Sequence, residues 1–249
     1  MIHSFLLIGQ SNMAGRGLLE DALPVDTSRI FTLRNGRFQE MFRPICPDRI
    51  KCGTNLAESF AEEYAKRNNV DVGLICCADG GTKIEQWLPG TLLYDNAVAN
   101  ARLAQRSSKI VGVLWHQGES DCKPEMSCLY KERFELLMSS LRKDLGLEDV
   151  PFILGGLGDF LADCVKYPEL LNYSVVNGIL EDIAKDNPMT GFVSAKGLGT
   201  IGDNLHFHSA ALHEFGLRYL EVYETFGVSV QTETTFDGEY KTRSSLEKL

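Results

Sequence analysis

Residues 5–17, FLLIGQSNMAGRG, decide the fold and raise the question of function. Phe5 to Ile8 are apolar without interruption and have the branched and aromatic composition of a strand that is buried on both faces. The run ends at Gly9, and Ser11 follows it closely. Ligands of open α/β sheets bind just beyond the carboxyl ends of the strands, so a serine here can act as a nucleophile. A Ser/Asn cap on a following helix is the structural alternative, and this stretch alone leaves both interpretations open.

The same pattern, an apolar run that ends in glycines or polar residues, recurs along the chain. Apolar runs at 5–8, 70–78, 109–115, 150–154 and 191–195 predict buried strands. Residues with apolar side chains at helical spacing lie between them, at 56–67, 92–107, 125–145, 169–185 and 210–224. Strands that alternate with helices predict a three-layer α/β/α sandwich on a mainly parallel, five-stranded sheet. The polar segments that follow the strands would then meet at one edge of this sheet.

Other segments predict local features. Asn35-Gly36 indicates the turn of a short hairpin over 29–38, which lies outside the five strands. Asn55 is placed to cap the helix that follows it. No linker, repeat or low-complexity run divides the chain, so we expect a single domain over 1–249 with a polar tail from about residue 231.

Composition restricts the class of protein. The chain has 249 residues, 25 of them basic and 34 acidic, and a net charge of −9, which argues against nucleic acid and anionic membranes as partners. It shows no apolar run long enough to span a bilayer and no signal peptide. We therefore expect a cytoplasmic protein whose seven cysteines are free thiols. Cys46 and Cys52 lack a second Cys/His pair at zinc-site spacing, which argues against a metal site.

Two further segments carry candidate catalytic groups. Asp203 and His206 are three residues apart in a loop before the last helix. This spacing can place the carboxylate on Nδ1 and leave Nε2 free to take a proton from a serine, although a histidine that caps the helix is the simpler explanation of D-x-x-H alone. Gly80 and Gly81 can expose backbone N–H groups to a ligand, as an oxyanion hole requires. A tight turn is the simpler explanation of two glycines alone.

Four motifs in a fixed order carry a family resemblance. They are G-Q-S-N-M-A-G-R-G at 9–17, G-G-T-K-I-E-Q-W at 80–87, H-Q-G-E-S-D at 116–121 and D-N-L-H-F at 203–207. With this set the chain resembles the SGNH hydrolase superfamily, the GDSL-like esterases, and within it the branch of sialate O-acetylesterases and acetylxylan esterases. The resemblance implies a flavodoxin-like SGNH hydrolase fold.

The resemblance also implies roles for individual residues. Ser11 would be the nucleophile, His206 the general base and Asp203 the acid that orients it. The backbone N–H groups of Ser11 and Gly81 would form the oxyanion hole, with the side chain of Gln117 as a third donor where most of the superfamily has Asn. Four residues are assigned to substrate binding: Gln10, Arg16, Trp87 and Glu119.

The implied activity is that of a serine esterase that removes O-acetyl groups from carbohydrates through an acetyl-serine intermediate. The substrate would be a small acetylated xylo-oligosaccharide or sialic acid, with Trp87 stacked on the sugar ring, and no metal or organic cofactor would be needed. Two alternatives stay open: a carbohydrate-binding module of the same fold without turnover, and a lipase or thioesterase on this scaffold. The polar motif residues argue against the apolar tunnel that a long acyl chain needs. The oligomeric state stays open too.

Overall fold

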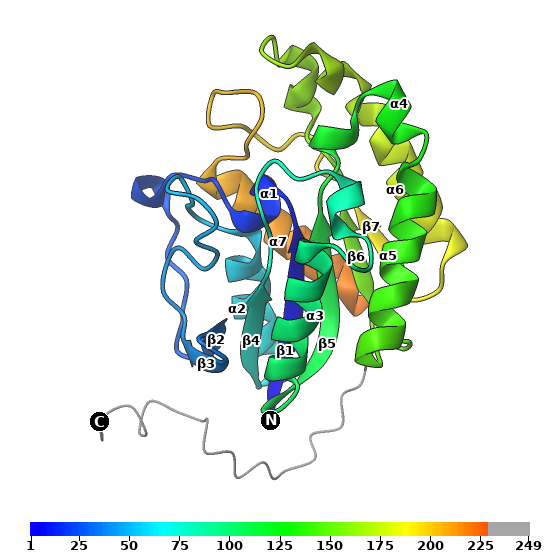
Figure 1. Cartoon of the computed structure of the whole chain (residues 1–249). Helices are drawn as coiled ribbons and strands as arrows, with labels where there is room; N and C mark the ends of the chain where they lie inside the picture. The colour runs from blue at the N-terminus through cyan, green and yellow to red at the C-terminus, as the bar shows by residue number, and fades with distance from the viewer. Residues whose placement is uncertain (229–249) are drawn as a thin grey trace.

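The computed structural model describes residues 1–228, so the predicted tail from residue 231 lies outside the described residues. Its centre is a seven-stranded sheet with the order β3-β2-β4-β1-β5-β6-β7 (Figure 1). All neighbouring strands pair in parallel except the β2–β3 hairpin. The strands are β1 (Ile2–Gly9), β2 (Ile30–Arg34), β3 (Arg37–Glu40), β4 (Asp71–Cys76), β5 (Ser108–His116), β6 (Phe152–Gly155) and β7 (Thr190–Val193).

The prediction of five strands was wrong by the two strands of the hairpin. The turn itself is where the sequence places it, since Asn35 and Gly36 have φ angles of 52° and 75°. β2 also pairs in parallel with β4, and this pairing extends the sheet at one edge. A turn signal identifies a hairpin but not the strand beside which the hairpin packs, so the sequence did not reveal that these two strands belong to the central sheet.

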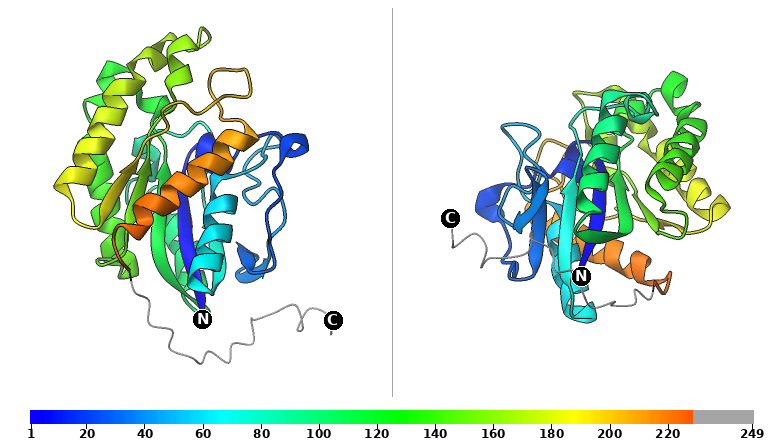
Figure 2. Two further views of the ribbon diagram at one scale, coloured as in Figure 1. Left: turned by 180° about the vertical axis from the view of Figure 1, so that it is seen from behind. Right: turned by 60° about the horizontal axis from the view of Figure 1, so that its bottom comes forward.

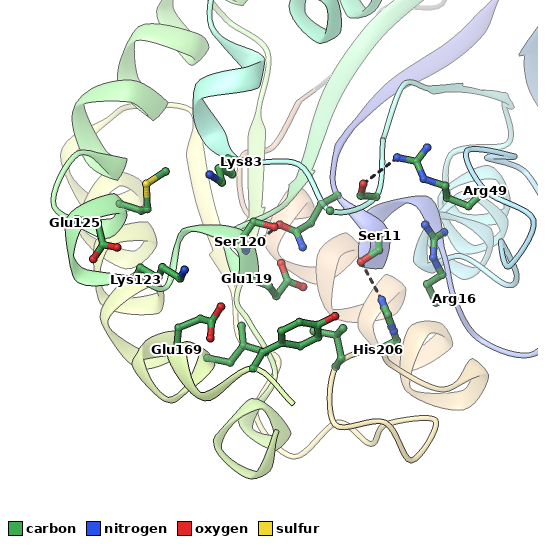
Figure 3. A pocket seen from close by; sticks show the side chains of 17 residues that line it. Ser11, Arg16, Arg49, Lys83, Glu119, Ser120, Lys123, Glu125, Glu169 and His206 are labelled. Carbon is green, nitrogen blue, oxygen red and sulfur yellow. Dashed lines mark hydrogen bonds between the residues drawn. The ribbon is translucent and has the colours of Figure 1, made fainter. Parts of the chain in front are cut away.

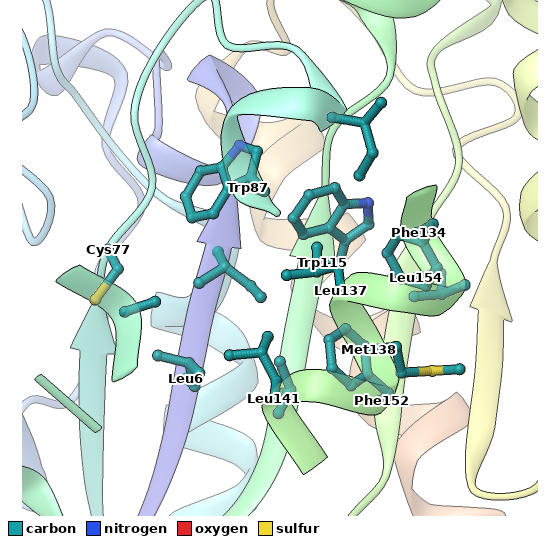
Figure 4. Packing of buried hydrophobic residues seen from close by; sticks show 14 of the residues in the cluster. Leu6, Cys77, Trp87, Trp115, Phe134, Leu137, Met138, Leu141, Phe152 and Leu154 are labelled. Atoms are coloured by element: carbon teal, nitrogen blue, oxygen red, sulfur yellow. The ribbon is translucent and has the colours of Figure 1, made fainter. Parts of the chain in front are cut away.

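Helices cover both faces of the sheet, which confirms the three-layer prediction (Figures 1 and 2). Side chains of β1 alternate between the layers: Leu6 and Ile8 join a cluster with α3, α5 and α6, whereas Phe5 and Leu7 pack with α2 and α7. Figure 4 shows the first of these clusters, in which Trp115 of β5 lies at the centre. The main helices are α2 (Leu56–Asn68), α3 (Leu92–Ala104), α5 (Tyr130–Leu145), α6 (Tyr173–Asp186) and α7 (Ser209–Glu224).

Two predicted helices begin later than their periodicity suggests. The segment expected to start at residue 125 is divided into α4 (Pro124–Ser127) and α5, and Leu129 at the junction is exposed. The segment expected from residue 169 opens with a 3₁₀ turn over Pro168–Asn172 before α6 begins. In both places a proline starts a short helical turn of its own, because its fixed φ suits a first turn.

The start of α2 connects the fold to the short helix that carries Ser11. Asn55 caps α2 as predicted, and Glu58 accepts a hydrogen bond from the Asn55 backbone N–H in return. The Asn55 amide also donates to the carbonyls of Met13 and Ala14, at 2.5 and 3.0 Å. These are the last residues of α1 (Ser11–Ala14), so one buried side chain fixes the end of α1 against the beginning of α2.

The sequence led us to expect seven free thiols, and the structure shows that this is wrong for two of the cysteines. Cys46 and Cys76 form a disulfide, with their Cα atoms 5.6 Å apart. Their separation of 30 residues follows no spacing rule, so only the fold brings them together. Cys77, the neighbour of Cys76, is a free buried thiol, and burial raises its pKa to about 12.

Over residues 1–228, no helix has both the length and the apolar character that crossing a bilayer demands.

Candidate active site

Ser11, His206 and Asp203 form a continuous chain of hydrogen bonds, although Ser11 and His206 are 195 residues apart in the sequence. Ser11 Oγ lies 3.1 Å from His206 Nε2, and the two side chains face each other in Figure 3. His206 Nδ1 lies 2.7 Å from Asp203 Oδ2. When Nδ1–H donates to the carboxylate, Nε2 is left as an acceptor for the serine hydroxyl. The structure therefore brings together the three residues that the resemblance singled out.

Asp203 is held as a carboxylate by its own loop. Partial burial raises its pKa, but hydrogen bonds from the His206 backbone N–H and ring and from the Leu205 backbone N–H outweigh that effect. The pKa of Asp203 is therefore below its ordinary value. The group stays ionised at neutral pH and keeps the proton of His206 on Nδ1.

The neighbouring histidine, His208, has a different structural position. Its Nδ1 accepts a hydrogen bond of 2.9 Å from the Ala211 backbone N–H and so caps α7. The structural alternative that the sequence offered for His206, a helix cap, is thus realised by His208 instead.

The hydroxyl of Ser11 opens onto a cavity of about 580 Å³ at the carboxyl ends of the central strands. Ser11 follows β1, Gly80 and Gly81 follow β4, and Glu119 follows β5. These strands are adjacent and parallel, so their carboxyl ends lie at one edge of the sheet. The expected convergence of the polar segments is therefore present in the structure.

The backbone N–H groups of the cavity residues Ser11 and Gly81 have no hydrogen-bond partner among residues 1–228. Gly81 has a φ of 75°, which favours glycine. A Cβ atom at Gly80 would lie 2.6 Å from Arg16 Nη2, so a side chain there would displace the guanidinium of Arg16.

The peptide between Gly80 and Gly81 is held from two sides. Asp48 accepts the Gly80 N–H at 2.9 Å, and Arg49 donates to the Gly80 carbonyl at 3.1 Å, a contact drawn in Figure 3. In a trans peptide the C=O and the following N–H point in opposite directions. Since the carbonyl faces Arg49, the Gly81 N–H points away from that contact, and Gly81 itself lines the cavity.

Gln117 does not line the cavity, which contradicts its assignment as the third oxyanion donor. The residue is fully buried, and its Nε2 faces three acceptors: Asp121 Oδ2 at 2.6 Å, the Thr82 carbonyl at 2.9 Å and Gln10 Oε1 at 3.1 Å. Its Nε2 is thus engaged behind the site, and its Oε1 is buried without a hydrogen-bond partner among residues 1–228. Sequence position after β5 identified the residue but not the direction of its side chain.

Of the four residues assigned to substrate binding, three line the cavity: Gln10, Arg16 and Glu119. The guanidinium of Arg16 is already engaged, since it makes a two-pronged ion pair with buried Asp48 at 2.9 and 2.7 Å. Trp87 is the exception.

Trp87 is completely buried in the cluster of Figure 4, so its expected stacking on a sugar ring is wrong. Its ring packs edge-to-face on Trp115 with centroids 5.7 Å apart, and its Nε1 donates to Thr82 Oγ1. Burial of the whole indole ring stabilises the protein more than a ring with one face exposed to solvent would. The presence of a tryptophan in the sequence does not show which of these two arrangements occurs.

Sequence reasoning missed several cavity residues. Arg49 lines the cavity, and its neighbour Asp48 binds the lining residue Arg16. Both lie in the irregular segment 41–53, which carries no periodicity that could place their side chains. Tyr167 also lines the cavity. With 37% of its surface exposed, it is the solvent-exposed phenol ring of the cavity within residues 1–228. No local signal distinguishes it from other surface tyrosines.

Comparisons with known proteins identify the family and the fold of the chain. The family model described as "Carbohydrate esterase, sialic acid-specific acetylesterase" matches residues 1–225. The "Probable carbohydrate esterase At4g34215" of Arabidopsis thaliana is 31% identical over 244 residues, which cover 88% of this chain and 89% of that protein. The X-ray structure of that Arabidopsis protein has a TM-score of 0.79 at 29% identity and is covered to 98%, against 90% of this chain.

Two more distant structures share the fold. The crystal structure of NanS has a TM-score of 0.69 at 20% identity, with 91% of this chain and 97% of that chain covered. The carbohydrate acetylesterase XAC1771 from Xanthomonas citri has a TM-score of 0.67 at 18% identity, with 92% and 57% covered. With a match to the family model over nearly its whole described length, the chain belongs to the sialic acid-specific acetylesterase family of carbohydrate esterases, which are carboxylic ester hydrolases with the SGNH hydrolase fold.

Proposed function

We propose that this esterase removes O-acetyl groups from carbohydrates through an acetyl-serine intermediate. The observation that carries the proposal is the chain of hydrogen bonds from Asp203 through His206 to Ser11 at the edge of the cavity. A serine hydroxyl is a weak nucleophile by itself and becomes a strong one when a positioned base takes its proton.

In the first step His206 Nε2 takes the proton of Ser11 as Oγ attacks the acetyl carbonyl carbon. The negative charge that develops on the carbonyl oxygen is held by the N–H groups of Ser11 and Gly81, which have no competing acceptor among residues 1–228. His206 then gives its proton to the departing sugar oxygen, and the acetyl group stays on Ser11. Asp203 stabilises the imidazolium between these two transfers.

In the second step a water molecule replaces the sugar. His206 takes a proton from the water as it attacks the acetyl-serine carbonyl, and the same N–H groups hold the oxyanion. The bond to Ser11 Oγ breaks, His206 returns the proton to Oγ, and acetic acid leaves, which releases its remaining proton to the solvent and becomes acetate. The proton and charge balance closes with the side chains of this chain alone.

The cavity favours a small polar substrate, either an acetylated xylo-oligosaccharide or an O-acetylated sialic acid. Its lining combines cations and carboxylates with apolar Met126, Leu170 and Leu205 and with one solvent-exposed aromatic ring, Tyr167. Polar groups that fix hydroxyls beside apolar surface suit a polyhydroxylated ring. A long acyl chain would have to lie among these charged groups and leave them without water.

The acyl-length preference tests this reading. We expect kcat/KM for p-nitrophenyl esters to be highest at acetate and to fall steeply beyond butyrate. A maximum at octanoate would instead support the lipase-like alternative. Absence of turnover with any ester, together with no labelling of Ser11 by an active-site serine probe, would support a binding module without catalysis.

The geometry of the Gly80–Gly81 peptide makes Arg49 a positioning residue. Replacing Arg49 by methionine removes the donor to the Gly80 carbonyl and leaves only the contact with Asp48, so the direction of the Gly81 N–H is less well fixed. Loss of one oxyanion donor typically costs about 10²–10³ in kcat, and we expect partial loss here, roughly tenfold. The fall should appear in kcat with little change in KM, because the oxyanion exists only in the transition state.

Arg67 offers a matched control for this variant, because it pairs with Glu224 on the surface and does not line the cavity. Arg67→Met is expected to leave kcat unchanged. A rise in KM with unchanged kcat for Arg49→Met would show that Arg49 binds substrate directly and does not orient the peptide.

A further inference from the structure

Glu119 has one carboxylate oxygen for which the protein supplies no partner. The residue lines the cavity but is itself only 4% exposed. Its Oε1 accepts a hydrogen bond of 2.6 Å from Asn12 Nδ2, whereas its Oε2 is buried without a hydrogen-bond partner among residues 1–228. Burial of a carboxylate oxygen without a donor costs free energy, and Oε2 is therefore an acceptor that a ligand can satisfy.

The neighbouring imidazole of His116 does not satisfy this oxygen. His116 Nε2 lies 3.1 Å from the Gly156 carbonyl, and such a contact requires the proton to be on Nε2. The Nδ1 atom of the neutral ring is then an acceptor, and it lies 3.8 Å from Glu119 Oε1. No described residue donates to Oε2, and Glu119 itself lines the cavity. Figure 3 shows the carboxylate of Glu119 between Ser11 and Lys123.

Asn12 fixes this carboxylate relative to the reacting groups. Its Nδ2 also donates to the Leu205 carbonyl at 3.1 Å, and its Oδ1 accepts the Phe207 N–H at 3.2 Å. These two contacts hold the backbone on either side of His206, and Asn12 is the residue next to Ser11. The position of Glu119 is thus tied through one amide to both the nucleophile and the base.

We propose that Glu119 Oε2 accepts a hydrogen bond from a free hydroxyl group of the substrate. The esterase would then select acetyl esters that still carry an unesterified hydroxyl close to the ester, as partially acetylated sugars do, over simple acetates and over fully acetylated rings. This inference rests on the proposed deacetylation and adds a requirement for one hydrogen-bond donor in the substrate.

Monoacetylated methyl pyranosides in which each free hydroxyl is replaced in turn by fluorine provide the test. Fluorine is similar in size but cannot donate. We expect one replacement to lower kcat/KM of the wild-type enzyme by about 10- to 100-fold, the range for a hydrogen bond to a charged group. In Glu119→Gln, which keeps the shape and an acceptor for Asn12, the ratio between the hydroxyl and the fluoro substrate should fall at least fivefold.

Glu125→Gln is the matched control, because the carboxylate of Glu125 lies in the same cavity but well away from Ser11 in Figure 3. It should leave the hydroxyl-to-fluoro ratio unchanged. If the wild-type enzyme hydrolyses the acetates but treats every fluoro substrate like its parent, the inference is wrong and the proposed function stands. A ratio that stays high in Glu119→Gln and falls in Glu125→Gln would assign the contact to Glu125. Failure to hydrolyse any acetate ester would overturn both proposals.

Discussion

Replacing Ser11 by alanine is expected to abolish ester hydrolysis and to leave the protein folded. The side chain is only 7% exposed, but the one hydrogen bond of its hydroxyl within residues 1–228 is the contact with His206. The substitution removes the attacking oxygen and few packing atoms. We expect kcat/KM for p-nitrophenyl acetate to fall by about 10⁴-fold or more, as it does when a nucleophile of this kind is removed.

The measurement combines turnover with thermal unfolding of the same preparation. A melting temperature within a few degrees of the wild type, with no turnover above background, supports the assignment. Turnover close to that of the wild type in the folded variant would show that another group is the nucleophile.

The two histidines of the loop before α7 should respond very differently to substitution. His206→Ala removes the base, and we expect kcat/KM to fall by about 10³-fold or more. His208→Ala removes a helix cap and should lower the free energy of unfolding by about 1 kcal/mol, with activity near that of the wild type.

His208→Asn is the control for this pair, because an asparagine side chain can cap the helix in place of the ring and should restore most of the stability. Kinetics and thermal unfolding of the three variants separate the roles. A larger loss of activity in His208→Ala than in His206→Ala would show that His206 is not the base and would overturn the mechanism.

The sequence predicted the parts of the fold that depend on local pattern. Apolar runs such as the one before Gly9 identify the central strands, because a strand buried on both faces has to be apolar throughout. Helical periodicity found the layers above and below. The pairing of β2 with β4 and the disulfide of Cys46 with Cys76 were not predictable, since each joins segments that no spacing rule connects.

In the candidate site, the sequence predicted where residues lie but not where all of their side chains point. Motif order located Ser11, Asp203 and His206, whose geometry is set by short segments at strand and helix ends. For Trp87 and Gln117 the motif gave the right neighbourhood, but both side chains turn into the protein interior. Side-chain direction at the end of a strand depends on what packs behind it, and that information lies elsewhere in the chain.

The acid and the base come from one short loop, whereas the nucleophile follows the first strand, which lies at the centre of the sheet. The Asp203–His206 pair can therefore form from local contacts, but its meeting with Ser11 requires the two ends of the described chain to come together. Contacts of such long sequence separation close late because they cost the most chain entropy. Turnover therefore shows that the whole chain has folded. A partly folded population that has its helices, but in which the loop with Asp203 and His206 is not yet packed beside Ser11, would show a helical signal and no enzyme activity.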